Sequence, residues 1–312
     1  MKAMKKITYA FVLLAVFGLL LAGCTKKETT ESTSNTTTDI QQLQKDENIV
    51  ENATDDVSND ANTVLSGGNG LKLWQGPCGV TIDSATTIGD TIIYHLTYNG
   101  PNCNNTLIRT GNVDVKKKIG EYWVNPGTTV TLTLINFHIV RILHPDHSVT
   151  FNGIKHFQNV TGGYLWMIGF ELSSVEHKVW GTVQATFSDN STRTWNIARQ
   201  QLFTGKQDSL VMAIDGLGTA DGYDKLVVWG INRQSKQFYS QIEQTVIYKQ
   251  ACTWDPCAGS QTLLLPTENK SATLTYGYDD NNQPITGDEC PTKFKLDWVW
   301  DGVSGTIFLP LP

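Results

Sequence analysis

The sequence predicts an all-β fold over residues 71–312: an antiparallel β-sandwich, or a pair of sandwiches, built from hairpins. The first reason is hydrophobic alternation with a period of two, which is typical of half-buried strands. The apolar residues of one parity fall in three runs: Val130, Leu132 and Leu134; Val179, Val183, Ala185 and Phe187; Ala272, Leu274, Tyr276 and Tyr278.

The second reason is the spacing of turn signals between these runs. Asp301-Gly302 separates two apolar-alternating arms, 292–300 and 303–309, and Asp-Gly is a preferred two-residue loop of a β-hairpin. Further turns are predicted at Asn152-Gly153, at 188–191 and at 232–236. The domain contains no pattern for a helix longer than about two turns, so closely spaced antiparallel strands are expected.

The chain begins with a segment typical of export. Lys2, Lys5 and Lys6 precede the apolar stretch 11–21, which is too short to cross a bilayer as a helix. Leu21-Ala22-Gly23-Cys24 then resembles the lipobox of bacterial lipoproteins. This resemblance implies a lipoprotein signal peptide at 1–23 and a lipidated thiol at Cys24.

Residues 24–70 are predicted to be the lipidated Cys24 followed by a disordered acidic tether. Between residues 25 and 70 the chain holds three Lys, nine Asp or Glu and no aromatic residue. Such a composition buries too little apolar surface to offset the entropy of ordering the chain. Ile40, Leu43, Ile49 and Val50 would support at most a turn or two of helix.

A weak internal repeat subdivides the globular part. Trp74-Gln75-Gly76-Pro77-Cys78 resembles Trp254-Asp255-Pro256-Cys257, and each is followed by an alternating strand and a polar loop with another Cys. Two related β units, about 71–140 and 250–312, would then flank a central β region. Chance similarity between short β motifs is the alternative.

Of the six cysteines, five remain if Cys24 is lipidated. An exported chain forms disulfides, and an odd number leaves one thiol over. The repeat selects Cys78–Cys103 and Cys257–Cys290, with Cys252 free and buried. Cys252–Cys290 is the competing pairing.

Short motifs over most of 75–305 resemble a group of lipoproteins of the Bacteroidota. They run in order from Arg109-Thr110-Gly111 through 126–131 and Phe151-Asn152-Gly153 to Thr194-Trp195, Arg199 and Gly205. The loop 99–103 departs from the more acidic, glycine-rich pattern expected there. The resemblance implies a cell-envelope location and no catalytic residues.

Candidate metal ligands are His144, Asp146 and His147, whose spacing a metal ion could use. The same segment also suits a solvent-exposed turn. The acidic loops 215–224 and 279–289 offer oxygen atoms for calcium, although neither has helix-loop-helix spacing. No cofactor is predicted.

Candidate ligand-binding residues are aromatic side chains that interrupt strand patterns: Trp74, Tyr164, Trp166, Tyr223 and Trp254. Their flat faces could stack on sugars. The alternative is that each closes one end of the sandwich.

The function that follows is a lipid-anchored cell-envelope protein acting as a binding or structural module, placed at the outer membrane and displayed on the cell surface. The alternatives are a glycan-binding accessory lipoprotein and a carbohydrate-active hydrolase, for which Asp297 and Asp301 are the only carboxylates suggested. The expected partners are the membrane, through the lipid, and a glycan or envelope protein. The net charge of −6 argues against nucleic acid.

Overall fold

The computed structural model describes residues 77–311, together with fourteen residues within 42–65, except that the side chains of His144 and His147 are not described. The signal peptide, Cys24 and Trp74 lie outside these residues. Three short 3₁₀-helices are η1 (Leu165–Met167), η2 (Gln250–Cys252) and η3 (Pro266–Glu268). The strands are β1 (Val80–Ile88), β2 (Thr91–Pro101), β3 (Leu107–Lys118), β4 (Thr129–Arg141), β5 (His144–Asn159), β6 (Ser174–Phe187), β7 (Thr192–Lys206), β8 (Ser209–Gly216), β9 (Gly218–Ala220), β10 (Tyr223–Ile231), β11 (Gln237–Lys249), β12 (Asp255–Leu265), β13 (Lys270–Tyr278), β14 (Lys293–Trp300) and β15 (Val303–Pro310).

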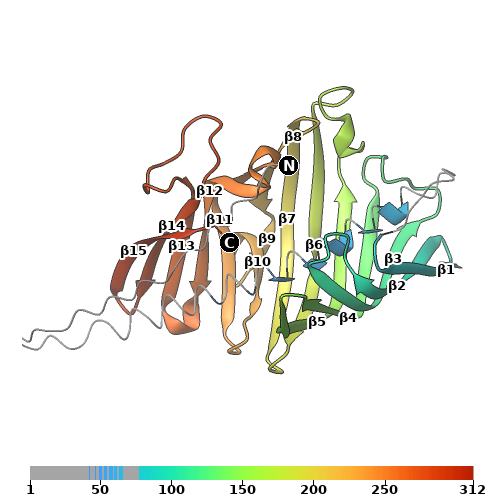
Figure 1. The fold of residues 1–312 in the computed structure, drawn as a ribbon, viewed down its shortest axis with the longest axis horizontal. Helices are drawn as coiled ribbons and strands as arrows, with labels where there is room; N and C mark the ends of the chain where they lie inside the picture. Colours follow the sequence, from blue (N-terminus) through green and yellow to red (C-terminus); the bar gives the residue numbers. More distant parts are fainter. Residues whose placement is uncertain are drawn as a thin grey trace, which may run out of the picture.

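These strands form one antiparallel sheet in which almost every strand pairs with its neighbour in sequence. The path runs from β1 to β7 and then through β10 to β15, as Figure 1 shows. The all-β, antiparallel and hairpin-rich character predicted from alternation is therefore confirmed. The Asp-Gly hairpin is confirmed too, because Asp301 and Gly302 have φ angles of 45° and 80° between β14 and β15.

The predicted sandwich is wrong in its layering, because the strands form one continuous sheet instead of two facing ones. Alternation reveals that one face of each strand is buried, but it does not reveal what covers that face. We call the buried side the core face; on β4 it carries Val130, Leu132 and Leu134, each at most 3% exposed.

A small closed barrel interrupts the sheet in its middle. The first part of β7 pairs with β10, and the remainder pairs with β8. On the other side β11 divides in the same way, pairing with β10 near its start and with β8 near its end. The four strands β7, β10, β11 and β8 thus close a ring, which separates the sheet into an N-terminal half (β1–β6) and a C-terminal half (β12–β15).

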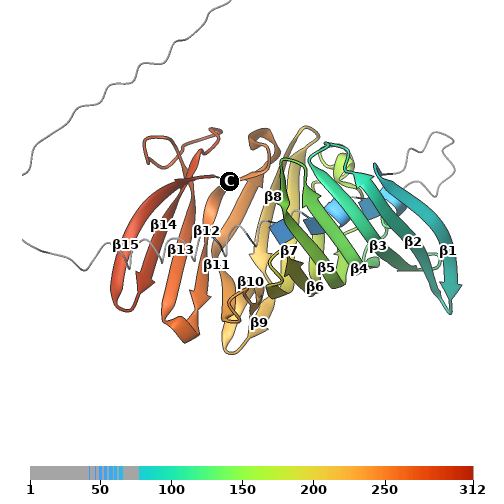
Figure 2. The same ribbon diagram turned by 60° about the horizontal axis from the view of Figure 1, so that its bottom comes forward.

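The N-terminal helix, which we define as the helical residues described within 42–65, crosses the core face of the sheet from the region of β10 towards β3 (Figures 1 and 2). Val50, Ala53, Val57, Ala61 and Val64 recur every three or four positions, and each is at most 5% exposed. The described helical residues are Gln42, Asp46, Ile49, Val50, Ala53, Thr54, Asp56, Val57, Ser58, Asp60, Ala61, Thr63, Val64 and Leu65.

This helix corrects the prediction of a disordered tether over 24–70 for the residues that the structure describes. Its buried residues join one hydrophobic cluster with residues of the sheet. The segment contains few apolar residues, mostly small Val and Ala, among many polar ones. Its overall composition is therefore that of a disordered segment, although it forms a helix. The helical spacing of the Val and Ala residues extends well beyond the one or two turns considered from sequence.

The two proposed repeat units, about 71–140 and 250–312, fall at opposite ends of the sheet. β1 to β4 lie at one end and β12 to β15 at the other, as Figure 1 shows. Among the described residues, no helix is both long enough and apolar enough to span a membrane.

Candidate functional site

The most exposed aromatic side chains of the described chain lie in the connection between β5 and β6. Trp166, in η1, is 60% exposed, and Phe170, four residues later, is 76% exposed. Tyr164 stacks beside Trp166, with ring centroids 6.0 Å apart and an angle of 13° between the planes. The predicted residues Tyr164 and Trp166 therefore lie together, and Phe170 joins them in the same connection.

A small hydrophobic base anchors this connection to the sheet. Ile168, fully buried, forms a small hydrophobic cluster with Val175, Phe203 and Leu210. Gly169 has a φ of +88° and a virtual Cβ only 2.8 Å from the Cβ of Lys206, so it permits an approach that another residue would block. The exposed aromatic side chains are consequently presented on ordered backbone.

The neighbouring connection, between β3 and β4, is hydrogen-bonded to the start of the β5–β6 connection. Gly163 N donates to Val124 O at 2.8 Å, and the buried Asn159 amide donates to Trp123 O and Gly163 O, each at 2.8 Å. The β3–β4 connection adds Tyr122, which is 55% exposed. We call Tyr122, Tyr164, Trp166 and Phe170 the aromatic rim. Sequence reasoning missed Tyr122 and Phe170, although both also lie between strand patterns.

The other predicted aromatic residues belong to different connections. Trp254, 37% exposed, follows η2. Tyr223, at the start of β10, packs on Tyr239 with centroids 4.5 Å apart. Of the four predicted aromatic residues that the structure describes, Tyr164 and Trp166 lie together, and Tyr223 and Trp254 lie in other connections.

The predicted metal ligands His144, Asp146 and His147 lie at the start of β5. The described part of the chain contains no group of three or more His, Cys, Asp or Glu side chains placed to hold a metal ion. Since the side chains of His144 and His147 are not described, this set stays a prediction.

The carboxylates suggested for a hydrolase are engaged in local contacts. Asp297 accepts a hydrogen bond from Thr306 at 2.6 Å and lies 2.8 Å from the Lys295 ammonium. Although desolvation acts in the opposite direction, these contacts hold the pKa of Asp297 below its usual value. A general acid needs a raised pKa, so Asp297 has the wrong electrostatics for that role.

The disulfides confirm one predicted pair and correct the other. Cys78–Cys103 forms as predicted. The second bridge is Cys252–Cys290, so Cys257–Cys290 is wrong and Cys257 is the free, buried thiol. Cys257 lies on β12, 3% exposed, where burial raises its pKa. Cys290 is exposed in the connection between β13 and β14, and its Cα lies 5.3 Å from that of Cys252.

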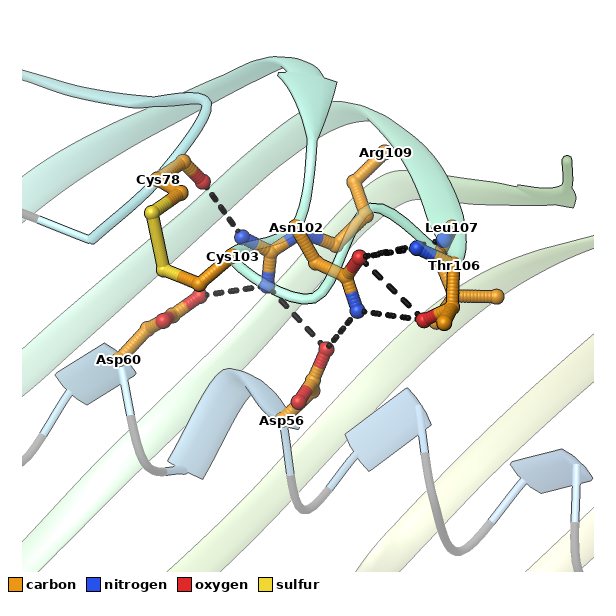
Figure 3. Close-up of a disulfide and its surroundings, with 8 residues drawn as sticks. All are labelled: Asp56, Asp60, Cys78, Asn102, Cys103, Thr106, Leu107 and Arg109. Atoms are coloured by element: carbon orange, nitrogen blue, oxygen red, sulfur yellow. Dashed lines mark hydrogen bonds and ion pairs between the residues drawn. A yellow bond between two sulfur atoms is a disulfide. The ribbon is translucent and has the colours of Figure 1, made fainter. Parts of the chain in front are cut away.

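A cluster of charged side chains lies beneath the N-terminal helix, where Arg109 is 1% exposed (Figure 3). Its guanidinium lies 2.7 Å from Asp60 and 3.5 Å from Asp56, both on the helix. It also donates to Cys78 O at 2.6 Å, next to the Cys78–Cys103 bridge. Burial raises the pKa of Asp60, and the charge of Arg109 opposes this shift.

Two further cations continue this pattern along the helix. Lys155, on β5 and 1% exposed, donates to Thr54 Oγ1 at 3.1 Å. Arg233, between β10 and β11, lies 3.3 Å from Asp46, and burial raises the pKa of that carboxyl. Three cations, Arg109, Lys155 and Arg233, thus contact the acidic N-terminal helix along its length. We call these three residues the cation row.

Each of these cations also lies over an aromatic ring. The distances to the ring centroid are 5.0 Å for Arg109 over Tyr98, 4.9 Å for Lys155 over Phe157 and 4.2 Å for Arg233 over Phe187. Stacking of this kind favours a cation in a desolvated position. We therefore interpret the cation row as the structural seat of the helix, and the aromatic rim as the candidate binding surface.

Comparison of the chain with protein family models, with characterised proteins and with solved structures finds no match. The two disulfides indicate an extracytoplasmic compartment, where such bonds form and persist.

Proposed function

We propose that this protein is a lipid-anchored component of a bacterial cell envelope, placed at the outer membrane and acting there as a binding module. The observation that carries the proposal is the agreement between two disulfides and an N-terminal sequence that resembles a lipoprotein signal. Both features belong to exported proteins. The resemblance to lipoproteins of the Bacteroidota supports the same location.

The anchor is tested by Cys24→Ser, because the thiol of Cys24 is the only acceptor for the lipid at the lipobox-like site. We expect the protein to move from the membrane fraction to the soluble fraction on cell fractionation. Several acyl chains on one residue give stable anchoring, at about 0.8 kcal/mol for each buried methylene. Membrane retention of the variant would contradict the proposal.

The binding role is assigned to the aromatic rim, with a glycan as the preferred ligand. Trp166 and Phe170 are exposed in a connection that a buried hydrophobic cluster anchors to the sheet. Exposing aromatic surface to water costs free energy, so a partner that stacks on these rings is favoured. The ring pair of Tyr164 and Trp166 provides flat faces of the size of a sugar ring. A structural role without ligand is the alternative.

Trp166→Ala tests this role. We expect it to weaken binding in a glycan array at least tenfold and to leave the free energy of unfolding nearly unchanged, because an exposed side chain contributes little to the core. Trp254→Ala, in another connection, is the matched control. A wild-type array without signal above background would overturn the glycan assignment.

A further inference from the structure

The two edges of the open sheet differ in how they are protected. Among the residues that the structure describes, β1 and β15 are the outermost strands, and each pairs on one side alone, with β2 and β14 respectively. An edge strand presents backbone N–H and C=O groups that can pair with another strand. Stable soluble proteins therefore usually interrupt such an edge with a charge, a bulge or a proline.

The β1 edge carries two of these protections. Its pairing with β2 shifts register between Ile82 and Ser84, which marks a β-bulge or irregularity. Asp83, at the same point, adds a charge to the edge. A regular ladder with a further strand would have to accommodate both features.

The β15 edge carries neither protection along most of its length. Its register with β14 is continuous from Lys293↔Pro310 to Trp300↔Val303. The sequence Val-Ser-Gly-Thr-Ile-Phe-Leu-Pro contains no charged residue, and its only proline, Pro310, is at the end. β15 is thus a regular, uncharged strand with one side that no described strand covers.

The side chains of β15 extend the core face of the sheet to this edge. Ile307 is opposite Leu296 and Leu309 is opposite Phe294, two residues of the hydrophobic core that are 1% and 3% exposed. At the edge, Ile307 is 38% exposed and Val303 is 48% exposed. An added strand would bury these apolar side chains while satisfying the backbone groups.

We propose that β15 pairs antiparallel with β15 of a second copy of this chain, so that two sheets join across a two-fold axis. Self-pairing brings no like charges together, because β15 contains no charged residue. The protected β1 edge disfavours head-to-tail pairing of β1 with β15. The remaining mode is isologous, which closes as a dimer.

The test is sedimentation velocity of the full chain, solubilised in detergent and measured in a density-matched buffer over a concentration series. We expect a dimer for the wild type and a monomer for Ile307→Lys, with association weakened at least tenfold. Ile88→Lys is the matched control: Ile88 is 69% exposed on the β1 edge, so this variant should remain a dimer.

Val303→Lys provides a second break in the same edge, and circular dichroism with thermal unfolding checks that each variant is folded. A wild type that stays monomeric up to high micromolar concentration would overturn the proposal and leave a strand of another protein as the occupant. Oligomers that grow beyond the dimer, or a dimer dissociated by Ile88→Lys, would overturn it in favour of head-to-tail pairing.

Discussion

The N-terminal and C-terminal halves of the sheet both have apolar core faces but differ in the charges that they bury. Beneath the helix, Arg109, the third residue of β3, and Lys155, on β5, are each 1% exposed and contact residues of the helix. In the C-terminal half the comparable cation is Lys270, 8% exposed at the first residue of β13, where it lies 2.6 Å from Glu268. The buried cations thus contact a helix distant in sequence in one half, and a residue two positions away in the other.

The difference explains how a polar N-terminal segment becomes part of the core. Apolar contacts supply most of the driving force, but they are tolerant of register. Buried ion pairs are costly unless both partners meet, so Arg109 with Asp60, and Arg233 with Asp46, favour one placement of the helix over others. We infer that the charges select the position and the Val and Ala side chains stabilise it.

Among the variants that test this difference between the halves, removal of Arg109 should have the largest effect on stability. We expect Arg109→Met to lower the free energy of unfolding by about 3–5 kcal/mol, because it leaves Asp60 buried without its cation. Lys270→Met should cost about 1 kcal/mol, because the Glu268 side chain retains access to water. Urea unfolding of the two variants measures the difference.

Hydrogen exchange locates the effect. In Arg109→Met, the amides of the N-terminal helix should lose protection before those of β12 to β14. Equal losses in the two variants, or a loss of protection spread evenly over the sheet, would contradict the assignment of the helix position to the buried charges.

The two disulfides provide the second comparison. Cys103→Ser and Cys290→Ser open bridges with sequence separations of 25 and 38, and each should cost about 3–4 kcal/mol in the chain-entropy model. Only Cys103→Ser should also loosen the helix, because Cys78 O accepts a hydrogen bond from Arg109. Cys257→Ala, which removes the free thiol, is the control for cysteine substitution and should leave both bridges intact in non-reducing peptide mapping.

The strands and most turns could be predicted from the sequence because their signals are local. Alternation places Val130, Leu132 and Leu134 on one face, and they are buried. Asn152-Gly153 misled this reasoning: it lies within β5, where a Cβ on Gly153 would be 2.3 Å from Thr182 O. Glycine is needed there for the close approach of β6 and not for a turn.

The helix and the second disulfide could not be predicted because they depend on contacts between distant parts of the chain. Asp60 meets Arg109, on β3, and Asp46 meets Arg233, beyond β10. Similarly, Cys252 and Cys257 are only five positions apart, so the sequence does not show which of them pairs with Cys290. The fold decides it, because Cys257 is buried as a free thiol. Of the aromatic rim, Tyr164 and Trp166 were accessible from sequence because they interrupt strand patterns.

Acid should affect the N-terminal half through His177. His177, on β6, lies between Trp123 and Phe203 with ring centroids 5.2 and 5.3 Å away. Burial lowers its pKa from 6.5 to about 4. As pH falls below 6.5 the unfolded chain binds a proton that the folded chain does not, so stability decreases until about pH 4.

His177→Phe keeps an aromatic ring in this position and removes the titration. Because one pKa unit corresponds to 1.36 kcal/mol, wild type should lose up to about 3 kcal/mol relative to the variant between pH 6.5 and 4. Asp46 and Asp60 act in the opposite direction, since their raised pKa values favour the folded state as pH falls, but they are common to both proteins. Urea unfolding at several pH values measures the difference, and an NMR titration of His177 checks its cause. Parallel pH profiles for the two proteins would show that this histidine is not the source of acid sensitivity.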